Sequence, residues 1–152
     1  MNAFEQFIKR ILDIIIAFFC LIVFSPLFLI CYFAIKREDG GDAIFVQERI
    51  GYKGKPFMIY KFRSMRMDAE KTGPALYKHQ EDDRLTKIGL YLREHHLDEL
   101  PQLWNVLIGD MSFIGPRPER KFFIDQIMER DSRYEQLYQI RPGVTSYATL
   151  YN

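Results

Sequence analysis

The segment from Ile14 to Ile35, IIIAFFCLIVFSPLFLICYFAI, decides how this chain is built, because 22 consecutive residues carry no charge. Only Ser25 and Pro26, near its middle, interrupt its apolar character. An α-helix of this length measures about 33 Å, against about 30 Å for the hydrocarbon core of a bilayer. The segment therefore predicts a membrane-associated helix followed by a water-facing domain.

Two features favour a re-entrant helix over a simple spanning helix. Pro26 predicts a kink because proline removes a backbone donor and clashes with the preceding turn, and the hydroxyl of Ser25 can satisfy a carbonyl that the kink exposes. Both flanks are basic, Lys9-Arg10 before and Lys36-Arg37 after, so the positive-inside rule suits both ends on the cytoplasmic side. The charged residues that directly follow the apolar segment also disfavour a cleaved signal peptide. We expect residues 1–37 to form a re-entrant membrane helix, with a spanning helix as the alternative.

The rest of the chain has the composition of an ordinary globular protein. The 152 residues include 21 Lys plus Arg and 20 Asp plus Glu, and this net charge of +1 argues against a general nucleic-acid binder, which carries a basic surplus. The two cysteines, Cys20 and Cys31, both lie in the apolar segment and predict buried thiols rather than a disulfide or a metal site. We expect residues 38–152 to form one cytoplasmic domain.

Hydrophobic periodicity predicts the elements of this domain. The expected elements are strands at 43–49 and 57–62 and helices at 85–94, 99–107, 117–130 and 132–139, with an irregular surface loop at 68–83. The two strands, joined by a long loop, predict a β-hairpin. The helix at 99–107 has an apolar stripe formed by Leu100, Leu103, Trp104 and Leu107. The expected fold is a small, mostly helical α/β domain at the membrane surface.

Basic residues are concentrated between Arg49 and Arg66, where six of them occur without a single acidic residue. Lys53 and Lys55, in the predicted loop, are equally well explained by contact with anionic lipid headgroups. Lys61 and Arg63 follow a strand, and their spacing of two directs both side chains to the same side. We therefore expect Lys61 and Arg63 to bind phosphate.

Asp98 and Glu99 are adjacent carboxylates at the start of the predicted helix 99–107. Their ordinary interpretation is helix capping, since Asp is a preferred N-cap and acidic residues suit the first turn. Carboxylates at such a position can also hold Mg²⁺, which takes one or two of them together with substrate phosphates, and an aspartate can attack phosphorus to form a covalent intermediate.

The stiff turn Gly115-Pro116-Arg117-Pro118 has two interpretations. It would fix the guanidinium of Arg117 in place, or it is a plain loop before a helix.

Four blocks of sequence, in chain order, point to a known family. They are FVQERIG at 45–51, YKFRSM at 60–65, LDELPQLWNVL at 97–107 and GDMSFIGPRP at 109–118. Together they resemble the bacterial sugar transferases and, more narrowly, the monotopic phosphoglycosyl transferases that start glycan assembly on polyprenyl phosphate. The resemblance implies a re-entrant helix broken at Ser25-Pro26. It also implies transfer of a sugar 1-phosphate from a UDP-sugar to polyprenyl (undecaprenyl) phosphate, with release of UMP, as the first membrane step of capsule, O-antigen or exopolysaccharide assembly.

The same resemblance implies roles for individual residues. Asp98 would be the nucleophile of a covalent phosphosugar intermediate, and Glu99 a ligand of Mg²⁺. Phosphate or nucleotide binding is implied for three arginines: Arg93, Arg117 and Arg141. The element Pro116-Arg117-Pro118 resembles the one that contacts the uridine end of the donor. The expected partners are the UDP-sugar, the polyprenyl phosphate and membrane lipid, without nucleic acid, while the identity of the sugar and the oligomeric state are not predicted.

The chain departs from the family pattern in three places. Asp83-Arg84 lacks an intervening proline, Ser146-Tyr147 replace a glycine and a large residue, and the chain stops at Asn152, where relatives continue, so we expect a shortened C-terminal end.

The alternative outside enzymology is a membrane-anchored module whose basic face binds anionic lipid or a partner. A multi-span phosphotransferase is disfavoured by the single apolar segment, and zinc chemistry is disfavoured because the side chains of His95 and His96 diverge by about 100° on a helix.

Overall fold

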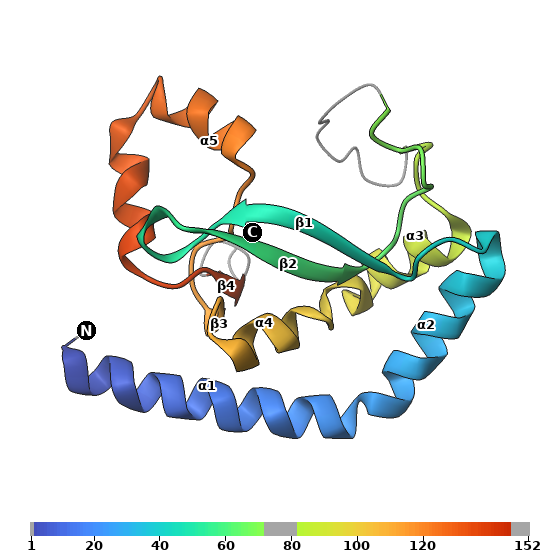
Figure 1. Cartoon of the computed structure of the whole chain (residues 1–152), viewed down its shortest axis with the longest axis horizontal. Helices are drawn as coiled ribbons and strands as arrows, with labels where there is room; N and C mark the ends of the chain where they lie inside the picture. The colour runs from blue at the N-terminus through green and yellow to red at the C-terminus, as the bar shows by residue number, and fades with distance from the viewer. Residues whose placement is uncertain (1, 72–81, 147–152) are drawn as a thin grey trace. The chain divides into compact units, whose positions relative to one another are not determined.

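The computed structural model describes residues 2–71 and 82–146 (Figure 1). By their internal contacts the residues divide into two compact units. Unit 1 comprises Met1–Val23, Val46–Tyr60 and Gln102–Asn152, and unit 2 comprises Phe24–Phe45 and Lys61–Pro101. This division does not follow the expected boundary at residue 37, which stays a prediction. The middle of the expected 68–83 loop, residues 72–81, lies outside the described residues.

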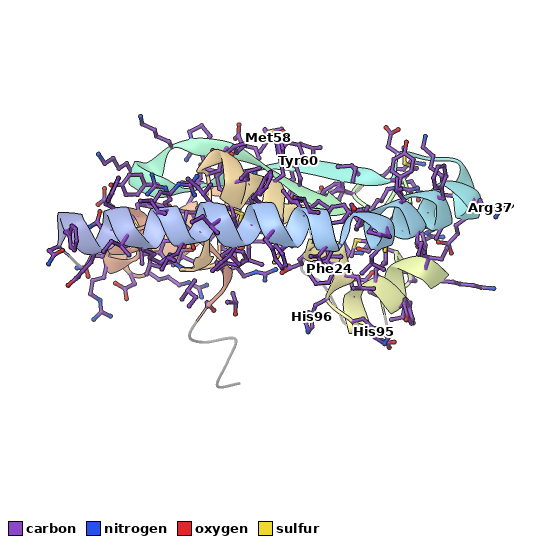
Figure 2. The ribbon with its side chains drawn as sticks, turned by 90° about the horizontal axis from the view of Figure 1, so that it is seen from below. Phe24, Arg37, Met58, Tyr60, His95 and His96 are labelled. Atoms are coloured by element: carbon purple, nitrogen blue, oxygen red, sulfur yellow. The ribbon has the colours of Figure 1, made fainter. Side chains whose placement is uncertain are left out.

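Two helices carry the apolar segment: α1 (Ala3–Val23) and α2 (Ser25–Asp39). They are separated at Phe24, which Figure 2 shows at the break, and Pro26 lies in the first turn of α2, where a proline interrupts no hydrogen bond. Within the described residues, no single helix is long and apolar enough to cross a membrane. Helices α1 and α2 meet this requirement of length and composition only when taken together, and they are bent by 62° at the break. The predicted interruption at Ser25-Pro26 is confirmed.

The predicted hairpin is also confirmed. Strands β1 (Ile44–Ile50) and β2 (Pro56–Phe62) form an antiparallel two-stranded sheet. The loop between them contains the short 3-10 turn η1 (Tyr52–Gly54), and Gly51 N and Lys55 O close its base with a hydrogen bond of 2.9 Å. Residues of the hairpin contribute to both units.

Unit 1 is built on α1, α4 (Gln102–Ile108) and a pair of short strands, with Ala17, Ile59, Val106 and Met111 buried at its core. Helix α1 turns a narrow stripe toward this core. Asp13 on that stripe is only 6% exposed, and its carboxylate accepts hydrogen bonds from Ser112 Oγ at 2.7 Å and from Lys9 Nζ at 3.1 Å. The remaining surface of α1 is mostly apolar and exposed, including Phe4 (71%) and Phe19 (65%).

Helix α4 is held at its C-terminal end by α1. The last carbonyls of a helix have no partner within the helix. Arg10 satisfies two of them, since its Nη1 donates to Val106 O at 2.6 Å and its Nη2 to Leu107 O at 2.9 Å. A residue of α1 therefore completes the C-terminal end of α4 within unit 1.

Strands β3 (Ser112–Ile114) and β4 (Gly143–Thr145) pair in parallel, with Ser112 opposite Gly143 and Ile114 opposite Thr145. Their backbones approach so closely that only glycine fits at two positions. A Cβ at Gly115 would lie 2.2 Å from Arg141 O, and one at Gly143 would lie 2.1 Å from Gly115 N. This contact fixes the turn after β3 against the segment before β4. Helix α5 (Lys121–Met128) and the 3-10 helix η4 (Ser132–Gln139) lie between these strands in sequence.

Unit 2 contains α2, α3 (Lys87–Glu94) and the short 3-10 turn η3 (Leu97–Glu99) around a core of Cys31, Ile35, Ala43, Phe62 and Leu92. The last turn of α2 supports the first turn of α3, because the Glu38 carboxylate accepts from Lys87 N at 2.8 Å. Gly40 then ends α2 in the left-handed conformation (φ 72°). Thr86 caps α3 by accepting from Gly89 N at 2.9 Å.

Candidate functional site

The two predicted carboxylates lie in unit 2, on η3. Asp98 is 7% exposed, and the Glu99 side chain is also largely buried. His96, in the left-handed conformation (φ 54°), reverses the chain between α3 and this turn. The expectation that the pair opens a helix at residue 99 is wrong: a 3-10 hydrogen bond from Leu100 N to Leu97 O closes η3, and α4 begins only at Gln102, after Pro101. The carboxylates are therefore presented by a tight turn and not by a helix N-cap.

Lys61 brings a cation to this turn, and the phosphate binding expected of it stays a prediction. Its Nζ lies 2.7 Å from Glu99 Oε1, and both side chains are about four-fifths buried. Burial raises the pKa of the Asp98 carboxyl above its ordinary value, and the charge of Glu99 acts in the same direction. Lys61, Arg93 and His96 oppose this rise in the pKa. The turn thus combines a poorly hydrated carboxylate with positive charges that favour its ionised form.

Arg93 reaches the same turn from the last turn of α3. Its Nε donates to Ser64 Oγ at 2.7 Å, and Ser64 itself is 5% exposed. The structure therefore gathers four predicted site residues in unit 2: Lys61, Arg93, Asp98 and Glu99.

Arg63 has a different environment from the phosphate site predicted for it. Its guanidinium bonds both carboxylate oxygens of Asp39, with Nη1 at 2.6 Å from Oδ2, and Nε donates to Asp42 O. The side chain is 7% exposed, and its bonds lower the pKa of Asp39 to about 2. The prediction assumed that strand alternation continues through residue 63, but β2 ends at Phe62. Arg63 therefore fastens the end of β2 to the end of α2, and the structure gives its assignment to phosphate no support.

The two carboxylates of η3 suit a magnesium ion that takes its other ligands from substrate and water, rather than a metal ion held entirely by protein side chains. The described residues contain no group of three or more His, Cys, Asp or Glu side chains placed to hold a metal. A pair of adjacent carboxylates supplies what Mg²⁺ requires when substrate phosphates and water complete its six ligands.

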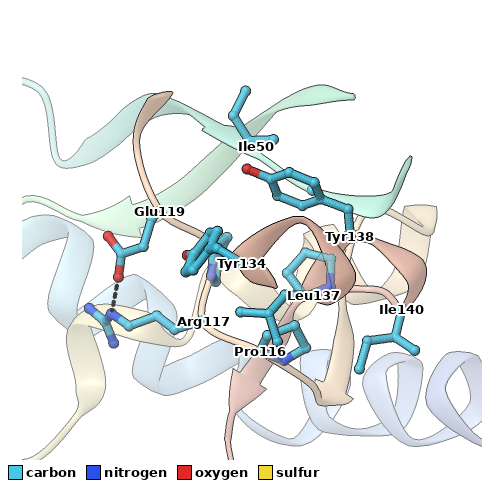
Figure 3. A pocket seen from close by; sticks show the side chains of 11 residues that line it. Ile50, Pro116, Arg117, Glu119, Tyr134, Leu137, Tyr138 and Ile140 are labelled. Atoms are coloured by element: carbon cyan, nitrogen blue, oxygen red, sulfur yellow. Dashed lines mark ion pairs between the residues drawn. The ribbon is translucent and has the colours of Figure 1, made fainter. Parts of the chain in front are cut away.

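A pocket lies in unit 1, and the predicted element at 116–118 forms part of its wall (Figure 3). The lining residues are Ile50, Gly51, Pro116, Arg117, Pro118, Glu119, Tyr134, Leu137, Tyr138, Ile140 and Pro142. The Arg117 side chain is 62% exposed, and its Nε lies 3.6 Å from Glu119 Oε1. Burial raises the pKa of Tyr134 to about 12. The pocket thus combines aromatic and proline surfaces with an exposed guanidinium at its edge.

Arg141, also predicted as a site residue, lies between Ile140 and Pro142 in sequence. Both of these neighbours line the pocket, whereas Arg141 does not. Its Nε donates to Gly109 O at 2.9 Å, and its guanidinium carbon lies 5.1 Å from the centre of the Tyr52 ring. Arg117 and Arg141 are therefore held in unit 1 by different contacts.

Sequence reasoning missed three residues of these sites. Tyr134 and Tyr138 were assigned only to a predicted helix, and their spacing of four was the signal that both could face one side. Ser64 belonged to the block YKFRSM without a role. His95 and His96, by contrast, are exposed; Figure 2 shows both pointing outward at the end of α3, and the centre of the His95 ring lies 4.1 Å from that of Tyr91.

Comparison with known proteins agrees with the four sequence blocks. The profile of the family described as "Bacterial sugar transferase" matches residues 4–152. A Bacillus subtilis (strain 168) protein named "Putative undecaprenyl-phosphate N-acetylgalactosaminyl 1-phosphate transferase" is 46% identical over 129 residues, which cover 85% of this chain and 72% of that protein. An Aeromonas hydrophila "UDP-N-acetylgalactosamine-undecaprenyl-phosphate N-acetylgalactosaminephosphotransferase" is 44% identical over 93% of this chain. A Caulobacter vibrioides (strain ATCC 19089 / CIP 103742 / CB 15) "UDP-glucose:undecaprenyl-phosphate glucose-1-phosphate transferase" is 45% identical over 92% of it.

The chain spans different shares of these relatives: 72% of the Bacillus protein, 52% of the Caulobacter protein and 33% of the Aeromonas protein. The family match nevertheless covers nearly every residue, including both carboxylates and all the predicted arginines. The chain is therefore a member of the bacterial sugar transferase family.

Proposed function

We propose that this protein transfers a sugar 1-phosphate from a UDP-sugar to undecaprenyl phosphate and releases UMP, at the first membrane step of bacterial glycan assembly. The names of the Aeromonas and Caulobacter relatives describe this type of transfer. The observation that carries the proposal is the cluster in unit 2, where the buried carboxylate of Asp98 lies beside Glu99, with Lys61 and Arg93 supplying positive charge.

In the first step, a carboxylate oxygen of Asp98 attacks the phosphorus that bears the sugar. The bond from this phosphorus to the bridging oxygen of the diphosphate breaks, and that oxygen leaves with UMP. Arg93 and Lys61 oppose the rise in the pKa of this carboxyl that burial causes, and they would offset the charge on the moving phosphoryl group. In the second step, a phosphate oxygen of undecaprenyl phosphate attacks the same phosphorus, and the Asp98 carboxylate leaves. Because the two steps are separate, the kinetics should be ping-pong.

Glu99 would hold the Mg²⁺ implied by this chemistry. When bound, the ion would neutralise negative charge on the donor diphosphate and on the leaving UMP. Lys61 already holds Glu99 at 2.7 Å, so this carboxylate is kept in place before any substrate arrives.

We assign the uridine end of the donor to the pocket in unit 1. Pro116 and Pro118 offer rigid apolar walls, and Tyr134 and Tyr138 line the same pocket. Flat aromatic and proline surfaces suit a nucleobase, while the guanidinium of Arg117, at the edge, suits phosphate.

We place residues 1–37 in the membrane as a re-entrant helix, with both ends at the cytoplasmic face of the bacterial inner membrane. The bend between α1 and α2, the exposed apolar side chains of α1 and the basic flanks support this topology. It would bring a water-soluble donor and a lipid acceptor to one surface.

The test is UMP release from a panel of UDP-sugars, with and without undecaprenyl phosphate. UDP-glucose and UDP-N-acetylgalactosamine are the first donors to try, because the relatives named above differ in this sugar. Asp98→Asn should abolish turnover, and mass spectrometry should find a phosphosugar increment on Asp98 after donor alone. Asp125→Asn is the matched control, since that exposed carboxylate pairs only with Lys121 among the contacts described, at 2.7 Å. Full turnover by Asp98→Asn would show that Asp98 is not the nucleophile, whereas no UMP release from any donor would favour a non-enzymatic lipid- or partner-binding module.

A further inference from the structure

Ser64 contacts helix α3 at both of its ends. Its carbonyl oxygen accepts a hydrogen bond from Thr86 N at 3.1 Å, at the N-cap of α3. Its hydroxyl oxygen accepts from Arg93 Nε at 2.7 Å, in the last turn. Ser64 is 5% exposed, so both bonds are shielded from water.

Gly89, between these two contacts, allows the close approach of α3 to Ser64. A Cβ on Gly89 would lie 1.9 Å from Ser64 O and 2.6 Å from Ser64 Cα. No side chain can be accommodated at that distance, because the obstacle is backbone and cannot rotate away. The N-cap of α3 at Thr86 and its two turns at Gly89 and Arg93 thus all contact one residue.

The contact with Ser64 orients Arg93 without neutralising it. A serine hydroxyl carries no charge, whereas a carboxylate in the same place would form an ion pair, as Asp39 does with Arg63. The positive charge of Arg93 remains effective at the turn that carries Asp98. Holding Nε also restricts the torsions of a side chain that is otherwise flexible.

From this geometry we infer that Ser64 is a positioning residue, whose hydroxyl holds the Arg93 guanidinium toward the phosphoryl group that is transferred to Asp98. This inference rests on the proposed function. It gives the serine of the block YKFRSM a role in the reaction, through Arg93, although Ser64 itself touches no substrate.

The test is a double-mutant cycle with Ser64→Ala and Arg93→Lys. Ser64→Ala keeps the backbone carbonyl that bonds Thr86 and removes only the hydroxyl. Arg93→Lys keeps a positive charge and removes Nε. We expect Ser64→Ala to slow adduct formation on Asp98 by about tenfold, as is typical for loss of a hydrogen bond to a charged group. In the Arg93→Lys background the same change should have almost no further effect, since its partner atom is already gone.

The affinity for UDP, whose terminal phosphate substitutes for the transferred group, gives a second readout that needs no turnover. It should weaken in Ser64→Ala and stay unchanged between Arg93→Lys and the double variant. Ser112→Ala is the matched control, because it removes another buried serine hydroxyl, bonded to Asp13 at 2.7 Å in unit 1. Any effect of Ser112→Ala should be the same in both backgrounds.

An equal loss from Ser64→Ala in both backgrounds, or wild-type rates and UDP affinity in Ser64→Ala alone, would overturn the inference. Failure of the proposed function gives a different result, since the wild-type protein would then form no adduct and Asp98→Asn would behave as wild type.

Discussion

The bond between Arg63 and Asp39 makes a prediction about stability whose size follows from the structure. The Asp39 carboxylate accepts from both terminal nitrogens of Arg63, and these bonds lower the pKa of Asp39 from 3.8 to about 2. A fall of this size corresponds to about 2.4 kcal/mol of folding free energy at neutral pH. Because the Asp39 side chain is 30% exposed, solvent screening reduces that figure, and we expect Asp39→Asn to cost about 1 kcal/mol.

The pH dependence has a definite sign. A carboxylate whose pKa is lower in the folded state stabilises the fold fully at pH values above its unfolded pKa, near 3.9, and the effect is lost as pH falls through the folded value of about 2. The difference in stability between wild type and Asp39→Asn should therefore be constant from pH 7 to pH 5. It should fall to about half by pH 3.

The measurement is urea unfolding in detergent micelles, followed by circular dichroism at each pH. Asp131→Asn is the control, because Asp131 bonds Arg133 with similar geometry but both side chains are more exposed, and exposed pairs contribute little to stability. A stability difference for Asp39→Asn that is absent at pH 7, or that grows as pH falls from 4 to 3, would refute the reasoning.

Three further changes test other parts of the structure. Gly89→Ala should destabilise the protein by about 3 kcal/mol or more, since the new Cβ would lie 1.9 Å from Ser64 O; unfolding by urea measures this, and wild-type stability would contradict the packing described. Lys61→Met should raise the KM for the donor about tenfold, yet tighten Mn²⁺ binding measured by EPR, because Glu99 loses its cation; weaker Mn²⁺ binding would show that Lys61 only supports the turn. Pro26→Leu should straighten the break at Phe24 and make a cysteine placed at Asn2 reactive to an impermeant reagent outside intact cells; labelling of that cysteine in the protein that retains Pro26 would count against the re-entrant topology, and protection in both proteins would show that Pro26 does not determine it.

The sequence predicted best the features that depend on neighbouring residues. Residues 43–49 and 57–62 were expected as a hairpin, and β1 and β2 occupy nearly the same ranges, because alternation and the turn residues at 51–56 are local signals. The break in the apolar segment depends on a single proline and was equally predictable. Helices α3 and α5 lie within their expected ranges, each shorter at one or both ends.

Features that depend on distant residues were missed. Strands β3 and β4 have three residues each and pair in parallel across nearly thirty intervening residues, so neither shows a pattern of its own. Glu99, the last residue of the 3-10 turn at Leu97–Glu99, was expected to begin a helix over 99–107, because Pro101 is tolerated in a first turn and does not reveal that α4 starts only at Gln102. Lys61 and Arg63 of the block YKFRSM were expected to act alike. They differ because Lys61 pairs with Glu99 and Arg63 with Asp39, and both partners lie far from the block in sequence.

The hydrogen bond between Asp13 and Ser112 has a consequence for biosynthesis. The two residues are 99 positions apart, so a ribosome adding about 5 to 20 residues per second takes about 5 to 20 s to supply the second after the first. During that interval α1 leaves the ribosome with a carboxylate whose later partner does not yet exist, while Lys9, one turn earlier, is already present as a counter-ion. The Asp13 carboxylate therefore has Lys9 as its local partner from the start, and it gains the Ser112 hydroxyl as a second donor when residues 102–114 arrive.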